Sequence, residues 1–420
     1  MRPFPRIALP FLIVLLGTAG MGARAEDLQE IDWSFSGEAR CRPEWRDNAD
    51  LDDAAGDDLR QGFMRIRLGL GAKVKERYRL FVQVQDSRVA GEEASTASNQ
   101  KNLDLHQGYA EITRGRFRLA LGRQEWFYGE HRLIGSFGWN NVGRAFDGVR
   151  ARYAREGFFL DALAAQIGTS VTSGASRGSG LYGLYSQTAP RQGAEYEAYW
   201  LAFADHVAAA GETGAPGTTR IHALGARAKD RFGRFDFTAE AVVQSGRLLG
   251  DDLSARAAAA QAGVSWGAGL KLRAFAGYDF ATGDEDPADG ERGEFFNFFP
   301  TNHPHYGYMD YEGWRNIRNP YAGASATRGR HFAQARAHRF SLDQERGPWK
   351  DAAGIVLGAD PTGASGRSVG SEIDVIYRFA WTDQAAVEGG LSRFAPGRFA
   401  RVTRGDDASR WAYLMLTFGF

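Results

Sequence analysis

Residues 64–74 read MRIRLGLGAKV, and apolar residues alternate with polar or small ones along the whole stretch. In a β-strand, successive side chains point to opposite faces of the sheet. One face would carry every second residue from Met64 to Val74, and the other every second residue from Arg65 to Lys73. The same alternation recurs in three further stretches, residues 79–86, 234–244 and 270–279. The pattern predicts many strands, each with one apolar and one polar face.

Two folds fit such strands: an antiparallel sheet of a soluble sandwich, and a transmembrane β-barrel with lipid outside and water inside. The repeated segments run about ten residues, which suits a tilted membrane strand better than the shorter average soluble strand. Length therefore favours the barrel.

The connections between the strands support the same choice, because membrane barrels alternate short periplasmic turns with longer extracellular loops. Short turns are expected near residues 75–77, 114–115, 155–157, 230–233 and 382–383. Longer polar stretches separate them, at residues 46–59, 89–103, 128–142, 206–218, 247–258, 282–318, 347–369 and 397–408. So many long loops are unusual in a compact soluble domain.

The last ten residues, WAYLMLTFGF, keep the alternation up to the terminal aromatic residue. Every second residue from Ala412 to Phe420 would form the lipid-facing row of a closing strand. This ending resembles the C-terminal signal that the assembly machinery of bacterial outer-membrane barrels recognises. A final strand of a soluble sheet is the alternative.

The N-terminus has the composition of a secretory signal peptide. Arg2 and Arg6 precede an apolar stretch at 7–22, and Ala23-Arg24-Ala25 has the small-residue pattern of a cleavage site. We expect residues 1–25 to be removed and residues 26–420 to form one barrel domain. With no run of 18 apolar residues elsewhere, the expected location is the outer membrane of a Gram-negative cell.

Composition agrees with an all-β channel and gives no sign of a nucleic-acid partner. Lys plus Arg and Asp plus Glu both number 51, while glycine reaches 53 residues. The single cysteine, Cys41, excludes an intramolecular disulfide framework. At roughly 20–24 residues per strand and connection, the mature chain predicts about 18 antiparallel strands, with 16 as the alternative, and both termini in the periplasm. Alternation is poorest in residues 168–192 and 318–350.

Several stretches resemble the alginate-export family of outer-membrane barrels. They are RIRLGLGAKV with LFVQVQDSR (65–88), LDLHQGYAEI (103–112), RLALGRQEWFYGEHRLIG (118–135), NVGRAFDGVRARY (141–153) and FFPTNHPHYGYMDYEGWRNI (298–317). The resemblance implies a monomeric 18-stranded channel with an arginine-lined lumen narrowed by loops that fold inward. The founding member exports alginate, a polyuronate, and many members carry other substrates.

A polyuronate carries one carboxylate per sugar, so its channel needs a positive lumen, and the planar fork of arginine can pair with carboxylate. By alternation, the lumen-facing candidates are Arg65, Arg67, Lys73, Arg79, Arg118, Arg150, Arg152, Lys271 and Arg273. The family motifs add Arg88, Arg123 and Arg144.

Arg123 shares the face of Leu119 and Leu121, so a bulge near Gly122 would have to turn it inward; otherwise it sits near the rim. Each of these arginines could also serve only to keep the wall wet, or pair with Asp147, Asp236 or Glu240.

The stretch 295–317 is too aromatic for a solvated loop. It could fold into the lumen as a constriction or sugar-stacking element, or it could form an interface girdle or pack against other loops. The residues concerned are His303, His305, Tyr306, Tyr308, Tyr311 and Trp314. The two histidines have no evident third partner for a metal site, and no cofactor is expected.

The sequence thus favours an export-type, passive channel for an anionic polysaccharide or oligosaccharide. A porin for uptake of small anions or other solutes is the alternative. An outer-membrane enzyme is disfavoured, because no Gly-x-Ser-x-Gly elbow is present and no catalytic residue can be assigned. The expected surroundings are outer-membrane lipid and lipopolysaccharide, with a periplasmic export partner possible.

Overall fold

The computed structural model describes residues 31–54, 56–92, 103–172 and 175–420. It is a closed antiparallel barrel of 18 strands, which confirms the predicted fold and strand number. The expected signal peptide, residues 1–25, lies outside the described residues. The barrel strands are β1 (Ile31–Asp47), β2 (Leu59–Val74), β3 (Tyr78–Val89), β4 (Leu103–Arg114), β5 (Phe117–Gln124), β6 (Phe146–Arg155), β7 (Phe158–Thr172), β8 (Ala175–Thr188), β9 (Glu195–Ala210), β10 (Pro216–Phe232), β11 (Phe235–Leu248), β12 (Asp251–Trp266), β13 (Lys271–Ala281), β15 (Ile317–Arg328), β16 (His331–Ser341), β19 (Ser368–Ala380), β20 (Ala385–Pro396) and β21 (Ser409–Gly419).

Four small elements lie in the long loops at one end of the barrel. They are β14 (Glu291–Arg292), which pairs parallel with β12, the two-stranded pair β17 (Trp349–Lys350) and β18 (Val356–Gly358), and helix α2 (Arg398–Thr403). No helix in the described ranges is long and apolar enough to cross a membrane.

The barrel closes between its first and last strands. β1 pairs with β2 on one side and with β21 on the other, and Gly37 and Phe420 exchange two backbone hydrogen bonds at the final residue. Closure leaves no sheet edge to face lipid, where unpaired backbone groups are costly.

The alternation in β2 separates two environments as predicted. Ile66 and Leu68 are 54% and 53% exposed, whereas Arg65 and Arg67 are only 3% and 8% exposed. Exposed apolar rows and buried charged rows invert the order of a soluble protein, so the outer face suits lipid. Leu414, Leu416, Phe418 and Phe420 continue this exposed row on the closing strand, as expected.

Two expected long loops are wrong. Residues 206–218 and 247–258 are mostly strand, because β9 and β10 extend to a turn at 211–215, and β11 and β12 to a turn at 249–250. Leu249 and Gly250 both have positive φ, of 57° and 96°, as in the tight turns that join hairpin strands. The poorly alternating stretches nevertheless form strands, namely β7 with β8 and β15 with β16.

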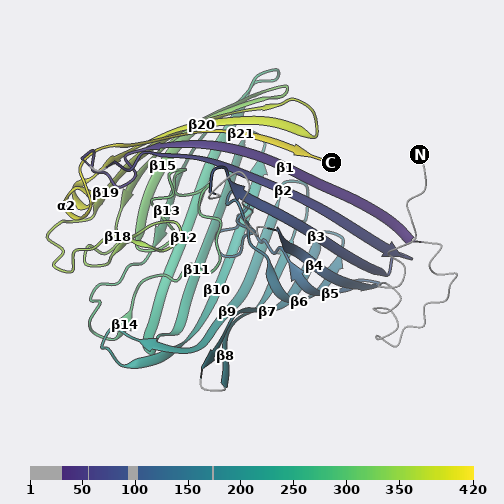
Figure 1. Cartoon of the computed structure of the whole chain (residues 1–420), viewed down its shortest axis with the longest axis horizontal. Coiled ribbons are helices and arrows are strands. Elements are labelled where there is room, and N and C mark those ends of the chain that lie inside the picture. The colour runs from purple at the N-terminus through teal and green to yellow at the C-terminus, as the bar shows by residue number, and fades with distance from the viewer. Residues whose placement is uncertain (1–30, 55, 93–102, 173–174) are drawn as a thin grey trace.

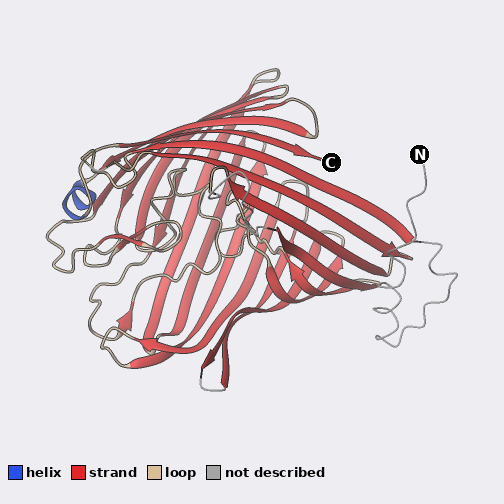
Figure 2. Ribbon diagram, in the orientation of Figure 1, coloured by secondary structure: helices blue, strands red, loops and turns tan. Residues whose placement is uncertain are grey.

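Two long loops from the extracellular end lie inside the ring of strands, where Figure 2 shows loop segments crossing the interior (Figures 1 and 2). We call residues 125–145 lumen loop A and residues 282–316 lumen loop B. Loop A connects β5 to β6, and loop B connects β13 to β15 and includes β14. Together they form the plug of the barrel.

A charge on the outer face should destabilise the barrel, whereas a charge on the inner face should not. Leu68→Arg, near the middle of β2, is expected to lower the free energy of unfolding by about 2–4 kcal/mol. Gln334→Arg, on the inner row of β16, is the matched control and should change it by less than about 1 kcal/mol. Urea unfolding in phospholipid vesicles measures both. Equal losses for the two variants would contradict the assignment of faces.

Candidate functional site

Four arginines form a basic cluster on the inner faces of β1 and β2. Arg40 and Arg42 alternate along β1, Arg65 and Arg67 along β2, and the strand register places Arg40 directly opposite Arg65. Like charges opposite each other in a sheet repel. Among the residues that the structure describes, three carboxylates pair with the cluster, which leaves it net positive: Glu38 with Arg65 at 2.7 Å, Glu44 with Arg42 at 2.6 Å, and Glu125 with Arg67 at 3.1 Å.

Lumen loop A supplies the remaining acceptors from its backbone. Five consecutive carbonyls, from residue 138 to residue 142, accept hydrogen bonds from the barrel wall. Arg40 donates to Gly138 O at 2.7 Å and Asn140 O at 3.0 Å, and Arg65 also reaches Asn140 O at 3.0 Å. The wall arginines therefore fasten this loop inside the lumen.

The same pattern continues along the loop. Arg42 donates to the carbonyl of Trp139 at 2.5 Å with its guanidinium 3.9 Å from the ring centroid, and Arg67 donates to that of Val142 at 3.1 Å. Gly143 follows with φ of 79°, and a Cβ there would lie 2.6 Å from the Arg67 guanidinium. Glycine lets the loop approach the arginine this closely.

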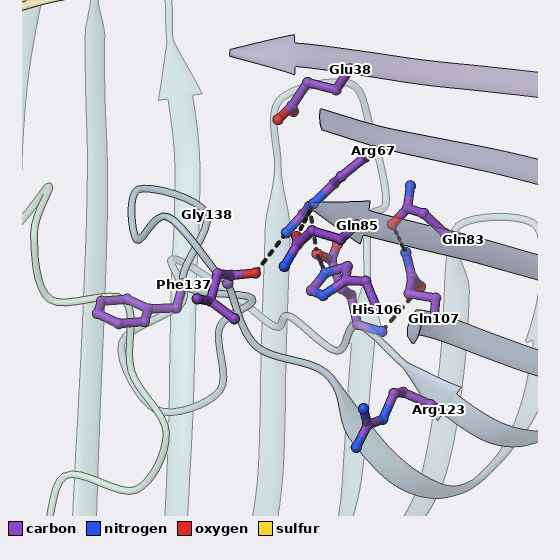
Figure 3. Close-up of polar contacts among 12 residues, drawn as sticks. Glu38, Arg67, Gln83, Gln85, His106, Gln107, Arg123, Phe137 and Gly138 are labelled. Atoms are coloured by element: carbon purple, nitrogen blue, oxygen red, sulfur yellow. Dashed lines mark hydrogen bonds and ion pairs between the residues drawn. The ribbon is translucent and has the colours of Figure 1, made fainter. Parts of the chain in front are cut away.

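Polar side chains of the barrel wall and of loop A surround Arg67 and fix its orientation (Figure 3). Its Nε donates to Gln85 Oε1 at 2.6 Å, and the Glu125 carboxylate that it contacts lies 2.7 Å from His106 Nε2. Gln107 joins this group by accepting from the Glu125 amide at 3.2 Å. Arg67 is thus held on three sides and is no freely moving lumen charge.

Lumen loop B forms a hydrophobic core inside the barrel. Tyr306 and Trp314 are fully buried and Tyr311 nearly so. The hydroxyl of Tyr311 donates to Ala49 O at 2.9 Å, and the indole of Trp314 to Phe280 O at 3.0 Å. None of these three rings has a face open to a ligand in this structure. Loop B lies inside the ring of strands, as one of the two interpretations of its sequence expected, and its rings are packed, as the other expected.

The two loops are joined to each other. Ile134 and Phe299 form a parallel bridge, and Gly135 N donates to Phe299 O at 2.9 Å. Arg144 donates to Pro300 O at 2.8 Å, and burial lowers its pKa to about 10. His305 lies with Nε2 2.8 Å from Glu130 O. The plug is therefore one packed unit.

One buried ion pair ties this unit to the wall. The Arg132 guanidinium lies 3.2 Å from Asp279 Oδ1 on β13 and donates to the Tyr306 hydroxyl at 2.6 Å. Asp279 is fully buried, so its charge depends on this partner and on Asn319, 3.3 Å away.

The histidine pair shows no metal-binding arrangement. His303 lies 3.0 Å from Asp310 and stacks on Trp139 at 4.1 Å, beside the half-buried Tyr308. His305 contacts loop A instead. Over the described ranges, no three His, Cys, Asp or Glu side chains are grouped for a metal ion.

Most of the other predicted pore residues are paired with carboxylates. Arg152 makes two bonds of 2.6 Å to Asp161, and the partners of Lys73, Arg88 and Arg273 are Glu76, Asp86 and Asp236. Arg123 pairs with Asp147 at 2.8 Å. No register shift occurs at Gly122, so Arg123 remains in the exposed outer row of Leu121 and does not turn inward. Lys271 is exposed at the short-turn end of β13.

A different environment surrounds the arginines nearer the short turns. One inner row across β3 to β6 contains Arg79, Glu111, Ala120 and Arg150. Arg118 lies two residues before Ala120, on the same face of β5. Arg118 is half exposed and only loosely paired, 3.5 Å from Glu111. In the described part of the chain, neither Arg79 nor Arg150 has a carboxylate within 4.0 Å, and the Arg79 guanidinium lies over the rings of Phe81 and Tyr109.

A cavity of about 330 Å³ opens beside these arginines. Its charged lining consists of Lys73, Arg77, Arg79 and Arg118, with Asp32, Glu76 and Glu111. The cavity therefore lies at the periplasmic end of the lumen, on the side of the plug opposite the long loops.

The opposite wall of the lumen is acidic. Tyr128, Tyr185 and Tyr199 stack in sequence, with centroids 4.3 Å and 5.1 Å apart. Their hydroxyls donate to Asp161, Glu197 and Glu240 respectively. Arg227 forms an ion pair with the same Glu197 carboxylate, with 2.6 Å between Nε and Oε2. The lumen thus has a basic side and an acidic side.

Sequence reasoning missed the two arginines of β1 and Arg132. Arg40 and Arg42 alternate in Arg-Cys-Arg, a signal that could have been read with the same rule as β2. Arg132 lies in a loop without periodicity, so no sequence pattern identifies its partner.

Comparison with known proteins places the barrel in context. The sequence model of a family described as alginate export matches residues 32–413. No curated protein matches the chain. Solved structures with a similar fold include OccK11 (OpdR) of Pseudomonas aeruginosa, with a TM-score of 0.61 and 11% identity over 93% of this chain and 96% of that one.

Two further structures are similar at comparable levels. OpdK of Pseudomonas aeruginosa, solved with vanillate, has a TM-score of 0.59 and 11% identity over 93% of this chain and 98% of that one. OccAB2 of Acinetobacter baumannii has a TM-score of 0.62 and 8% identity over 93% and 98%. At such identities the likeness shows the fold alone.

Removing the buried cation should loosen the plug. Arg132→Ala leaves Asp279 charged and buried, so we expect the free energy of unfolding to fall by about 3–5 kcal/mol and the single-channel conductance to rise. Thermal unfolding and planar-bilayer recording measure the two effects.

The double variant Arg132→Ala/Asp279→Asn removes both charges and is the control. It should recover part of the lost stability, since no unpaired charge remains buried. Equal stability of the single variant and the unaltered protein would contradict the role of the pair.

Proposed function

We infer the cargo of this outer-membrane channel from one premise: the chain belongs to the alginate export family. We propose that it provides a passive, selective path for an anionic polysaccharide or oligosaccharide, alginate-like in carrying carboxylates along the chain. The family and the structural neighbours are channels rather than enzymes. The family and the fold support a channel, and the charged residues of the lumen support an anionic cargo.

The observation that carries the proposal is the row of unneutralised arginines at the periplasmic cavity. Arg79 and Arg150 have no carboxylate partner within ion-pair distance, in the ranges the structure covers, and Arg118 is held at 3.5 Å by Glu111. The cavity itself is lined by four cations, Lys73, Arg77, Arg79 and Arg118, and by three carboxylates, Asp32, Glu76 and Glu111. Arg150 adds a fifth cation in the adjoining inner row. A narrow pore concentrates such a field and raises the local concentration of anions.

The aromatic rings near these arginines suit a sugar chain. Phe81 and Tyr109 pack 5.5 Å apart beside Arg79, and both are only partly buried. A ring face next to a guanidinium can hold an apolar sugar face while the arginine pairs with the sugar carboxylate. Half-exposed rings bind weakly enough to let the cargo move on, as conduction requires.

The location of this row supports export. The arginines lie on the periplasmic side of the plug, so a polymer arriving from the periplasm meets them before the constriction. The proposal includes a monomeric barrel, assembled through the exposed row that ends at Phe420, and surrounded by outer-membrane lipid and lipopolysaccharide. A periplasmic partner that feeds the pore fits the same direction.

Uptake of small anions is the second candidate. It is favoured by the fold shared with OpdK, whose structure holds vanillate, a small aromatic carboxylate. The packed plug also narrows the lumen, which suits a small solute. The two candidates differ in the size of the anion that enters the pore.

The charge of the pore can be tested by the reversal potential in a planar bilayer under a salt gradient. We expect anion selectivity, and Arg79→Gln/Arg118→Gln/Arg150→Gln should reduce the selectivity ratio at least about two-fold, because the row loses its positive field. Arg123→Gln, in the outer row, is the matched control and should leave it unchanged. Cation selectivity of the unaltered protein would sink the proposal.

The size of the cargo can be tested by current block. A linear oligogalacturonate added on the periplasmic side should interrupt the current at lower concentration than benzoate, and a neutral maltooligosaccharide should not. Block by benzoate alone would instead support the uptake porin.

A further inference from the structure

We propose that the tip of lumen loop A, residues 136–145, is a built-in competitor for the anionic cargo. Its carbonyl groups occupy the guanidinium groups of Arg40, Arg42, Arg65 and Arg67, and a carboxylated polymer opens the channel by taking these groups over. The inference rests on the proposed function, since it concerns how the same cargo passes the plug.

The first support is the continuity of the contact. Every carbonyl from residue 138 to residue 142 accepts a hydrogen bond from the wall, and four of the five accept from an arginine of the cluster. A loop that merely filled space would not need five successive carbonyls turned toward one wall.

The second support is the chemistry of the acceptors. A carbonyl is a neutral acceptor, and it leaves the charge of the guanidinium uncompensated. A carboxylate adds the attraction between opposite charges, and it can accept from the guanidinium with both oxygens. The capped cluster, with four arginines and three carboxylates, therefore still attracts anions and would gain by exchanging carbonyls for carboxylates.

The third support is the way in which the tip is held. At the centre of the tip, from residue 138 to residue 143, no side chain is buried, whereas Arg132, Leu133 and Ile134 at the base are. Trp139 is the one aromatic side chain at the centre of the tip. It is half-buried and packs against Arg42, His303, Trp411 and Tyr413. Apart from this ring, the centre of the tip is attached by exchangeable polar contacts, while the base is fixed in the plug core.

One side chain offers a way to loosen the tip without touching an arginine side chain. The amide of Asn141 donates to the backbone carbonyls of Met64 at 3.2 Å and Arg88 at 3.0 Å. Asn141→Ala removes both bonds and leaves the whole basic cluster intact. Asn48 is the control. Its side-chain amide also donates to a backbone carbonyl of another segment, that of Ala408, but the bond lies away from loop A.

The experiment compares these variants of the full barrel in planar bilayers, with oligogalacturonate as the probe. For Asn141→Ala we expect the half-blocking concentration to fall about three- to ten-fold and the conductance to rise, since two ordinary hydrogen bonds no longer oppose the exchange. Anion selectivity should be kept. Asn48→Ala should behave as the unaltered protein.

A second variant guards against a folding defect. Ser87→Ala removes the hydroxyl that donates to Asn141 O at 2.9 Å, and it should shift the block in the same direction by a smaller factor. Arg65→Gln should also raise the conductance, but it should weaken the block, because it removes a charge that loop and cargo share.

The outcomes separate the two proposals. If Asn141→Ala and Ser87→Ala fold and leave the half-blocking concentration unchanged in an anion-selective channel, the competition is refuted while the proposed function stands. If no variant is anion selective, the proposed function itself fails.

Discussion

The closed hydrogen-bond ladder between β1 and β21 is the constraint on which the rest of the structure depends. Within a bilayer, every backbone N–H and C=O must find a partner in the protein, so a sheet can span it only by closing on itself. Closure fixes the two faces of every strand, and the outer face then accepts only apolar side chains near the middle. All the charge of the strands is thereby directed into the lumen or to the rims.

A lumen that collects charge in this way must balance it, and the barrel does so unevenly. On the acidic side, stacked tyrosines and Arg227 cover the carboxylates. On the basic side, there are fewer carboxylates than arginines, and backbone carbonyls of lumen loop A serve as acceptors. The interior therefore keeps positive charge in two places: under the loop, and in the row of Arg79 and Arg150 near the periplasm. Each place lies on a different part of the path through the barrel.

The plug is held by two kinds of force with different consequences. Loop B and the base of loop A form an apolar core with one buried ion pair, Arg132 with Asp279, and such a core is costly to open. The tip of loop A is attached by the ring of Trp139 and by polar contacts that an anion could replace. A rigid frame with one exchangeable segment can narrow a pore and still admit a charged polymer.

Alternation in the sequence determined the faces of the strands, the exposed row that ends at Phe420, and the inward side of Arg65, Arg67, Arg118, Arg150 and Arg152. These follow from the sequence because a strand has a period of two, and one buried face leaves no freedom of register. The family resemblance added the inward loops. The ends of the strands were less well determined. The turn at 249–250 lies within a polar stretch, and the alternation of side chains there does not show where one strand ends and the next begins.

Only the tertiary structure decided what each arginine contacts. Arg65 binds a loop carbonyl, Arg152 a carboxylate, and Arg150 no carboxylate within reach in the described chain, although all three carry the same inward signal in the sequence. The rings of Tyr306 and Trp314 became core rather than stacking surface for the same reason. The partner of an inward side chain is set by how the loops fold across the lumen, and loops have no period from which that fold can be read.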